Sequence, residues 1–169
     1  MLEKEIANAT LEELEELEKQ IQARKLELNP FSELKSMSNK AFGEGWSEPY
    51  IRNHVPNLEK NNGTGHDMRG KHYKTIEVKS SRLTFDENWT MNQIHCDEAE
   101  AFLFVWYNCK NGTQEICFIP TEDLIAGCTR SRQHTREGKM CCTISSTKKN
   151  REILKKYMIS SWEILNEVV

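Results

Sequence analysis

Hydrophobic residues recur at helical spacing in the first part of the chain. Five aliphatic side chains follow one another at intervals of three, four and seven positions: Leu11, Leu14, Leu17, Ile21 and Leu28. This spacing predicts an amphipathic helix, and the capping-box pattern of Thr10 to Glu13 and the Asn29-Pro30 pair mark its two ends. We expect the helix to pack on the rest of the domain, although two heptads of a coiled coil also fit the spacing.

A second apolar stripe follows at helical spacing. Ile51, Val55 and Leu58 share one face, and the pattern predicts a helix with Ser47 as its N-cap and a proline in its first turn. Glu48 precedes Ile51 by three positions, so the two side chains lie on the same side of the helix. The carboxylate of Glu48 is therefore expected to face inward.

The middle of the chain changes to β-strand patterns. Residues 101–107 (AFLFVWY) are apolar throughout, which is typical of a central strand buried on both faces. Shorter patterns predict strands over 73–80 and 115–119, an edge strand over 141–145, and short helices over 121–126 and 148–157. We therefore expect an α/β fold, with a central mixed sheet flanked by helices and an N-terminal helical extension.

Length and composition restrict the class of protein. A chain of 169 residues suits one domain, so we expect residues 1–40 as a helical segment packed on the same domain as residues 41–169. The longest apolar run has seven residues, too few to span a membrane, and the charged N-terminus does not resemble a secretory signal. We expect a cytoplasmic protein without a membrane partner. The six cysteines lack metal-binding spacing and are expected to be reduced thiols.

Candidate chemistry is concentrated between residues 65 and 81. In a strand, side chains two positions apart share a face, so Glu77 and Lys79 project together. Asp67 follows a glycine turn ten positions earlier, where a hairpin or a preceding strand can return it beside Glu77. Two carboxylates and the carbonyl of Val78 form an oxygen-rich set suited to Mg²⁺. Lys79 beside them could orient or help deprotonate a water, or stabilise charge on a phosphate.

The order of Asp67 and then Glu77-Val-Lys79 resembles the signature of the PD-(D/E)XK nuclease superfamily, in the variant where the aspartate follows Gly-His instead of proline. The resemblance extends over residues 43–107. It implies a restriction-endonuclease-like fold and Mg²⁺ as cofactor, with Mn²⁺ able to substitute for it. It further implies that Asp67, Glu77 and Val78 hold the metal and that Lys79 is catalytic.

Three further features fit the same resemblance. Glu48, on a helix upstream of the aspartate, is similar to the acidic helix residue that many members use near the metal, which implies a metal-binding and catalytic role. Gln93 follows the lysine strand, as in members that carry a catalytic glutamine on the next helix. The apolar residues 101–107 then occupy the place of the central strand after that helix.

Each of these residues also has a structural interpretation. Glu77 and Lys79 could form a solvated ion pair on an edge strand, and Asp67 could close a glycine-rich turn. Glu48 could be a first-turn acid that satisfies the helix dipole, and Glu44 competes with it for a metal role. The order, the spacing and the flanking strand together favour the joint metal site.

Charge is distributed unevenly in a chain of net charge −3. From Arg130 to Lys156 nine basic residues stand against two acidic ones, a local balance of +7, and such density suits phosphate contacts. A solvated basic loop and helix is the alternative. We expect a DNA-binding segment at residues 129–156, where arginine and glutamine can read base edges. The residues expected to bind DNA are Arg130, Arg132, Gln133, Arg136, Lys139, Lys148 and Lys149.

Together these features predict a Mg²⁺-dependent, sequence-specific endonuclease similar to a type II restriction enzyme. It would hydrolyse double-stranded DNA and leave 5′-phosphate ends, as the resemblance implies. Cutting two strands with one site per chain favours a homodimer. Two alternatives stay open: a structure-specific or repair nuclease of the same fold, and a DNA-binding module whose acidic cluster is structural.

Overall fold

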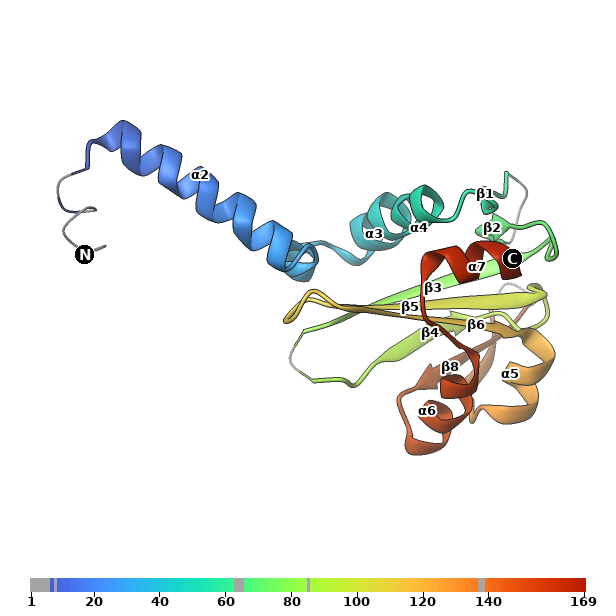
Figure 1. Ribbon diagram of the computed structural model, residues 1–169. Helices are drawn as coiled ribbons and strands as arrows, with labels where there is room; N and C mark the ends of the chain where they lie inside the picture. Colours follow the sequence, from blue (N-terminus) through green and yellow to red (C-terminus); the bar gives the residue numbers. More distant parts are fainter. Residues whose placement is uncertain (1–6, 8, 63–65, 85, 137–138) are drawn as a thin grey trace.

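The computed structural model describes residues 7, 9–62, 66–84, 86–136 and 139–169, with residues 135, 136, 139 and 140 described by their backbone alone. The larger of its two sheets has six strands in the order β1-β2-β3-β5-β6-β9 (Figure 1). These strands are β1 (Glu59–Lys60), β2 (Met68–Arg69), β3 (Ile76–Leu83), β5 (Ala101–Asn108), β6 (Gln114–Pro120) and β9 (Met158–Ile159). β3 and β5 run parallel, and the other neighbours are antiparallel. The sheet is mixed and the fold is α/β, as predicted.

β5 is the central strand of this sheet. It lies between β3 and β6, and its first seven residues are all buried, which confirms the prediction of a strand covered on both faces. Alternation along the strand directs Leu103 and Val105 toward one hydrophobic cluster and Phe104 and Trp106 toward another. The first cluster contains residues of α4 (Glu48–His54) and α7 (Trp162–Val168). The second contains residues of a smaller sheet.

A continuous helical run covers one face of the larger sheet. It consists of α3 (Asn39–Phe42), the π-helical turn η2 (Gly43–Ser47) and α4. Ser38 is its N-cap, because the Ser38 hydroxyl accepts the Ala41 N–H at 3.3 Å. Ser47 was expected to be the cap of α4, and this expectation is wrong. The helix has already begun upstream, so the backbone N–H of Glu48 bonds to the carbonyl of Gly43 and needs no cap.

The smaller sheet has the strand order β4-β8-β7. Its strands are β4 (Thr90–Ile94), β7 (Ser131–Arg136) and β8 (Lys139–Ser145). The expected edge strand at 141–145 is therefore a strand with neighbours on both sides. The segment that contains Gln93 was expected to be helical and is instead the strand β4. Pairing with β8 holds this segment extended, and the irregularity between Met91 and Ile94 lets both residues face the second hydrophobic cluster although they are three positions apart.

Two short helices accompany the smaller sheet, α5 (Thr121–Gly127) and α6 (Lys148–Leu154). Both occur where the sequence predicted them, although α6 ends earlier and continues as the 3₁₀ turn η3 (Lys155–Tyr157). α7 and the strand β7 were not predicted. All six cysteines are free thiols, as expected.

The N-terminal helix α2 (Leu11–Leu28) projects away from both sheets (Figure 1). Its bounds match the prediction, and the capping box of Thr10 and Glu13 is present. None of its residues is buried, so the expected packing of this helix on the domain is not observed. A 3₁₀ turn, η1 (Ser32–Ser36), follows it. Within the described residues, no helix combines the length and the apolar character needed to cross a bilayer.

Candidate active site

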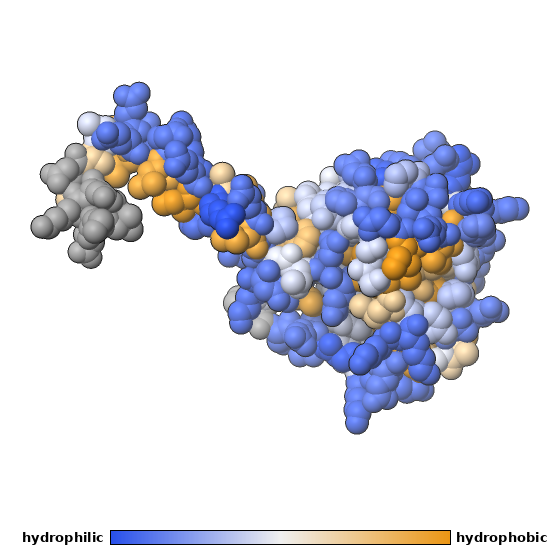
Figure 2. Space-filling view, viewed as in Figure 1, coloured by the Kyte–Doolittle hydropathy of each residue, from blue (hydrophilic) through white to orange (hydrophobic). Residues whose placement is uncertain are grey.

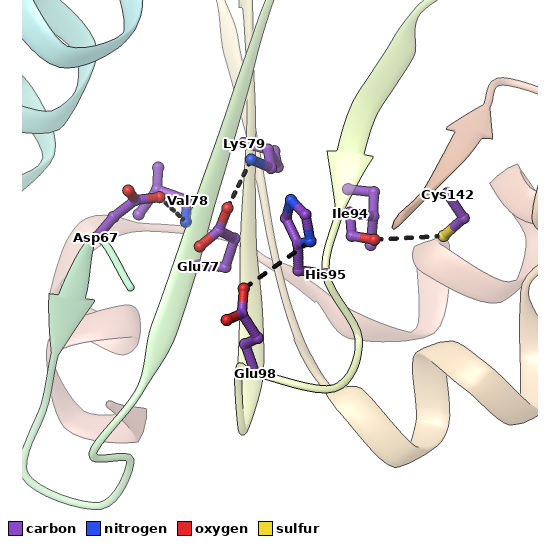
Figure 3. Close-up of polar contacts among 8 residues, drawn as sticks. All are labelled: Asp67, Glu77, Val78, Lys79, Ile94, His95, Glu98 and Cys142. Carbon is purple, nitrogen blue, oxygen red and sulfur yellow. Dashed lines mark hydrogen bonds and ion pairs between the residues drawn. The ribbon is translucent and has the colours of Figure 1, made fainter. Parts of the chain in front are cut away.

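A short hairpin brings Asp67 to the middle of β3. Met68 in β2 pairs with Ile76 in β3, so the residue before Met68 reaches the strand one step further along. Carboxylate oxygen Oδ2 of Asp67 accepts the backbone N–H of Val78 at 2.8 Å (Figure 3). The prediction that a hairpin returns Asp67 to the neighbourhood of Glu77 is confirmed. This bond anchors the aspartate to the larger sheet, so Asp67 does more than close a glycine-rich turn.

Glu77 and Lys79 lie on the same face of β3 and form an ion pair. Lys79 Nζ and Glu77 Oε1 are 2.6 Å apart, and the two side chains are only 21% and 10% exposed (Figure 3). Burial raises the pKa of the Glu77 carboxyl, the Lys79 ammonium opposes this, and the Asp67 carboxylate adds to it. β3 has a neighbour on each side. The interpretation of a solvated pair on an edge strand is therefore excluded.

Glu48 occupies the first turn of α4, with a side chain 15% exposed. Burial raises the pKa of its carboxyl, and the nearby Asp67 carboxylate raises it further. Arg52 compensates only in part, because its Nη1 lies 3.9 Å from Glu48 Oε2. Glu44 is exposed, whereas Glu48 lines the cleft described below. The structure thus favours Glu48 over Glu44 as the helix carboxylate.

Ser47 holds the start of α4 over the larger sheet. Its hydroxyl is 2.6 Å from the hydroxyl of Ser80 on β3 and 3.1 Å from that of Tyr107 on β5. Ser47 itself is fully buried. π-helical turns such as the one that ends at Ser47 are frequent at functional sites. These two bonds fix Glu48, the next residue, near β3.

A cleft of about 410 Å³ runs along this part of the molecule. Four of the residues singled out in the sequence line it: Glu48, Val78, Lys79 and Gln93. Gln93 reaches the cleft from β4, where the pairing with β8 is irregular and its own φ is +56°. Asp67 and Glu77 do not line the cleft. They lie behind it, bound to Val78 and Lys79.

The donor set around Val78 fits Mg²⁺ in type and charge. Asp67 and Glu77 repel one another, since the Asp67 carboxylate raises the pKa of Glu77, and a divalent cation relieves such repulsion. Mg²⁺ usually takes one or two carboxylates and keeps several waters. Across the described residues, no group of three or more His, Cys, Asp and Glu side chains is placed to hold a metal. Glu48 therefore does not join the other two carboxylates as a third direct ligand in this arrangement.

His95 is a neighbour of the site that the sequence did not identify. It follows β4 and lies close to Glu77 and Glu98 (Figure 3). Its Nδ1 is 3.9 Å from Glu98 Oε2, and its charge acts to lower the pKa of Glu77. No spacing in the sequence links residue 95 to residue 77, because the contact depends on how β4 returns toward β3.

The basic segment forms the outer part of the smaller sheet and the start of α6. Arg132 and Gln133 are exposed on β7. Lys148 and Lys149 are exposed in the first turn of α6, where a helix dipole disfavours positive charge, so helix stability does not explain them. Arg130 is half-buried and lies near the thiol of Cys96.

Two expected DNA contacts, Arg136 and Lys139, are Cα partners in the β7–β8 hairpin. Their side chains lie outside the described part of the structure.

Cys142 Sγ donates to the Ile94 carbonyl at 3.6 Å and helps to tie β8 to the end of β4 (Figure 3). β4 therefore connects the cleft to the basic hairpin, which consists of β7 and β8. It contributes Gln93 to the cleft and pairs with β8.

In comparisons with known proteins, no protein-family model matches this chain and no curated protein matches it in sequence.

Proposed function

We propose that this protein is a Mg²⁺-dependent DNA endonuclease with a restriction-endonuclease-like fold and an activity similar to that of type II restriction enzymes. One observation carries the proposal. The Asp67 carboxylate is bonded to the backbone of β3 between Glu77 and Lys79, and those two side chains form an ion pair in which Glu77 is buried and Lys79 is half-buried. Buried acids of raised pKa beside a lysine are costly for stability, and such groups are concentrated at functional sites.

The donors have separate roles in this proposal. Asp67, Glu77 and the Val78 carbonyl would hold Mg²⁺, with Glu48 supporting through a water or through its charge. Bound Mg²⁺ would supply Lewis-acid stabilisation of the scissile phosphate and a more acidic water. Lys79 lines the cleft, so its ammonium can orient the attacking water or stabilise charge on the phosphate. Gln93, which lines the cleft from β4, would hydrogen-bond to the substrate.

Hydrolysis would proceed by attack of water on phosphorus and cleavage of the bond from phosphorus to the 3′ oxygen. The attacking water would give up a proton, the 3′ oxygen would take one up and leave as a 3′-hydroxyl, and the phosphate would stay on the 5′ end. The basic residues of β7 and α6 would hold the DNA, because exposed lysine and arginine neutralise phosphates. Arg132 and Gln133 carry the donors and acceptors that base edges require. β4 links that surface to the cleft.

A plasmid digest tests the proposal. Purified protein is incubated with mixed-sequence plasmid and Mg²⁺, with EDTA as the blank, and the ends are determined by run-off sequencing. Discrete bands with 5′-phosphate ends are expected. Cleavage restricted to branched or mismatched DNA would point to a structure-specific nuclease. Binding without cleavage in either Mg²⁺ or Mn²⁺ would make the acidic cluster structural and overturn the proposal.

The chain offers a matched control for this digest. Glu59 and Arg69 form a second ion pair of 2.6 Å, but their side chains are 63% and 60% exposed. Glu77→Gln should abolish cleavage, whereas Glu59→Gln should cleave like the wild type. Equal loss in both variants would indicate general damage to the fold instead of loss of a site.

A further inference from the structure

The helix α2 presents an apolar stripe that nothing in the described structure covers. None of its 18 residues is buried. Figure 2 shows hydrophobic residues along one side of the projecting helix and hydrophilic residues along the other. Its exposed large hydrophobic residues are Leu11, Leu17, Ile21, Leu26 and Leu28.

Specific contacts nevertheless fix both ends of the helix. At the start, the Thr10 hydroxyl and the Glu13 carboxylate form a reciprocal capping box. At the end, Asn29 Nδ2 donates to the Cys109 carbonyl at 2.9 Å. Gly112 has a φ of +74° and packs so closely that an added Cβ would lie 2.8 Å from the Cα of Asn29. The domain thus fixes the point from which α2 leaves it.

A helix of this length gains most of its stability from packing of its apolar face, so the stripe needs a partner. At about 100° per residue, Leu14, Leu17, Ile21 and Leu28 fall within an arc of about 60°. Leu26 lies roughly 150° away from the centre of that arc by the same rotation. A narrow stripe of this kind is typical of a seam between two helices.

The charges of α2 indicate the nature of that partner. Residues 11–18 contain five glutamates and no basic residue, whereas residues 19–28 contain three basic residues and one glutamate. Two copies in parallel would align the acidic halves and repel each other. Two antiparallel copies would instead move the two acidic halves to opposite ends of the pair, and like a symmetric dimer interface they would be self-complementary.

We propose that α2 mediates homodimerisation through antiparallel pairing with α2 of a second copy of this chain. If Leu17 lies across from Leu28 of the second copy, Glu18 of each copy flanks Lys25 of the other. By symmetry this ion pair occurs twice. The proposal does not depend on the nuclease function, although it provides the two sites that cutting both strands requires.

Sedimentation of the full-length chain over a range of concentrations tests the pairing. The wild type should approach twice the monomer mass. Leu17→Glu should raise the dissociation constant by at least about tenfold, since a carboxylate then replaces the apolar contact with Leu28 on both copies. Leu26→Glu is the matched control, because Leu26 is 42% exposed and Leu17 37% while Leu26 lies off the stripe. Thermal unfolding of each variant checks that the domain remains folded.

A charge exchange then tests the orientation. Glu18→Lys and Lys25→Glu should each weaken an antiparallel dimer, and the double variant should recover its affinity. In a parallel pair Glu18→Lys would instead relieve repulsion and strengthen association. A wild-type chain that stays monomeric at every concentration overturns the proposal, as does equal loss of dimer in Leu17→Glu and Leu26→Glu.

Discussion

The charged groups of the cleft and those of the basic hairpin lie on two sides of β4 and differ in environment. In the cleft region the buried Glu77 and the half-buried Lys79 are bonded to each other, and the pKa of Glu77 depends on Asp67 as well. On the smaller sheet Arg132 and Gln133 are exposed. Buried charges act as a unit, because each one fixes the ionisation and position of the next. Exposed charges act through solvent, so their effects on a polyanion add.

From this contrast we expect substitutions of the two carboxylates, Asp67 and Glu77, to have the largest effect on cleavage. Asp67→Asn keeps an oxygen that can accept the Val78 N–H, and Glu77→Gln keeps the shape of the side chain. Under the proposed function we expect each to reduce cleavage by at least about 100-fold, because Mg²⁺ would lose a charged ligand. DNA affinity should be retained or increased, since a carboxylate that repels phosphate is gone. Single-turnover cleavage and binding titrations measure the two quantities separately. Near wild-type cleavage by either variant would contradict the assignment.

Lys79 should show the next largest effect. Under the proposed function Lys79→Ala should reduce kcat about 100-fold while DNA affinity changes little, because the ammonium would act on the reacting water or phosphate. Arg69→Ala, which removes the cation of the exposed pair, is the control and should retain activity. If the only defect of Lys79→Ala is weaker binding with a strong dependence on salt, Lys79 is a phosphate contact.

The exposed region should respond more weakly and in two ways. Arg132→Ala and Gln133→Ala should each cost roughly 1–3 kcal/mol at the cognate site and relax discrimination at one base pair, if these residues read bases. Lys148→Ala and Lys149→Ala should weaken all sequences alike and reduce the slope of log K against log salt by about one. Competition between cognate and scrambled duplexes across a salt series separates the two groups. Unchanged affinity and specificity in all four variants would make this a solvated surface.

The smallest effect concerns stability and pH. Burial raises the pKa of Glu77 in the folded chain above its ordinary value of 4.5, so the folded state holds this proton more tightly than the unfolded state. The resulting contribution to the free energy of unfolding is present below pH 4.5 and is lost as pH rises through the higher folded pKa. Glu77→Gln lacks this proton.

The Tm of the wild type relative to that of Glu77→Gln should therefore fall as the pH is raised from about 4 to about 7. Glu59→Gln removes an exposed carboxylate and should show no such trend. If the Tm of both variants changes with pH in the same way as that of the wild type, burial does not raise the pKa of Glu77.

Several features were determined by the sequence alone, because they depend on neighbours within a few residues. The capping box at Thr10 and the termination at Asn29-Pro30 set the bounds of α2. The unbroken apolar run of β5 required cover on both faces, and it has that cover. Alternation in β3 placed Glu77 and Lys79 on one face, and their ion pair follows from it.

Tertiary structure decided what depends on partners far along the chain. Whether residues 141–145 form an edge depends on β4 and β7, which pair with them on both sides. Gln93 lies in a strand because its segment pairs with β8, which is far along the chain. Ser47 bonds to β3 and β5 because the helix had already begun at Ser38. The apolar stripe of α2 was predictable from the sequence. That the domain does not cover it depends on the direction in which α2 leaves the domain at Asn29. Periodicity specifies which face of an element is apolar, and long-range packing specifies what covers it.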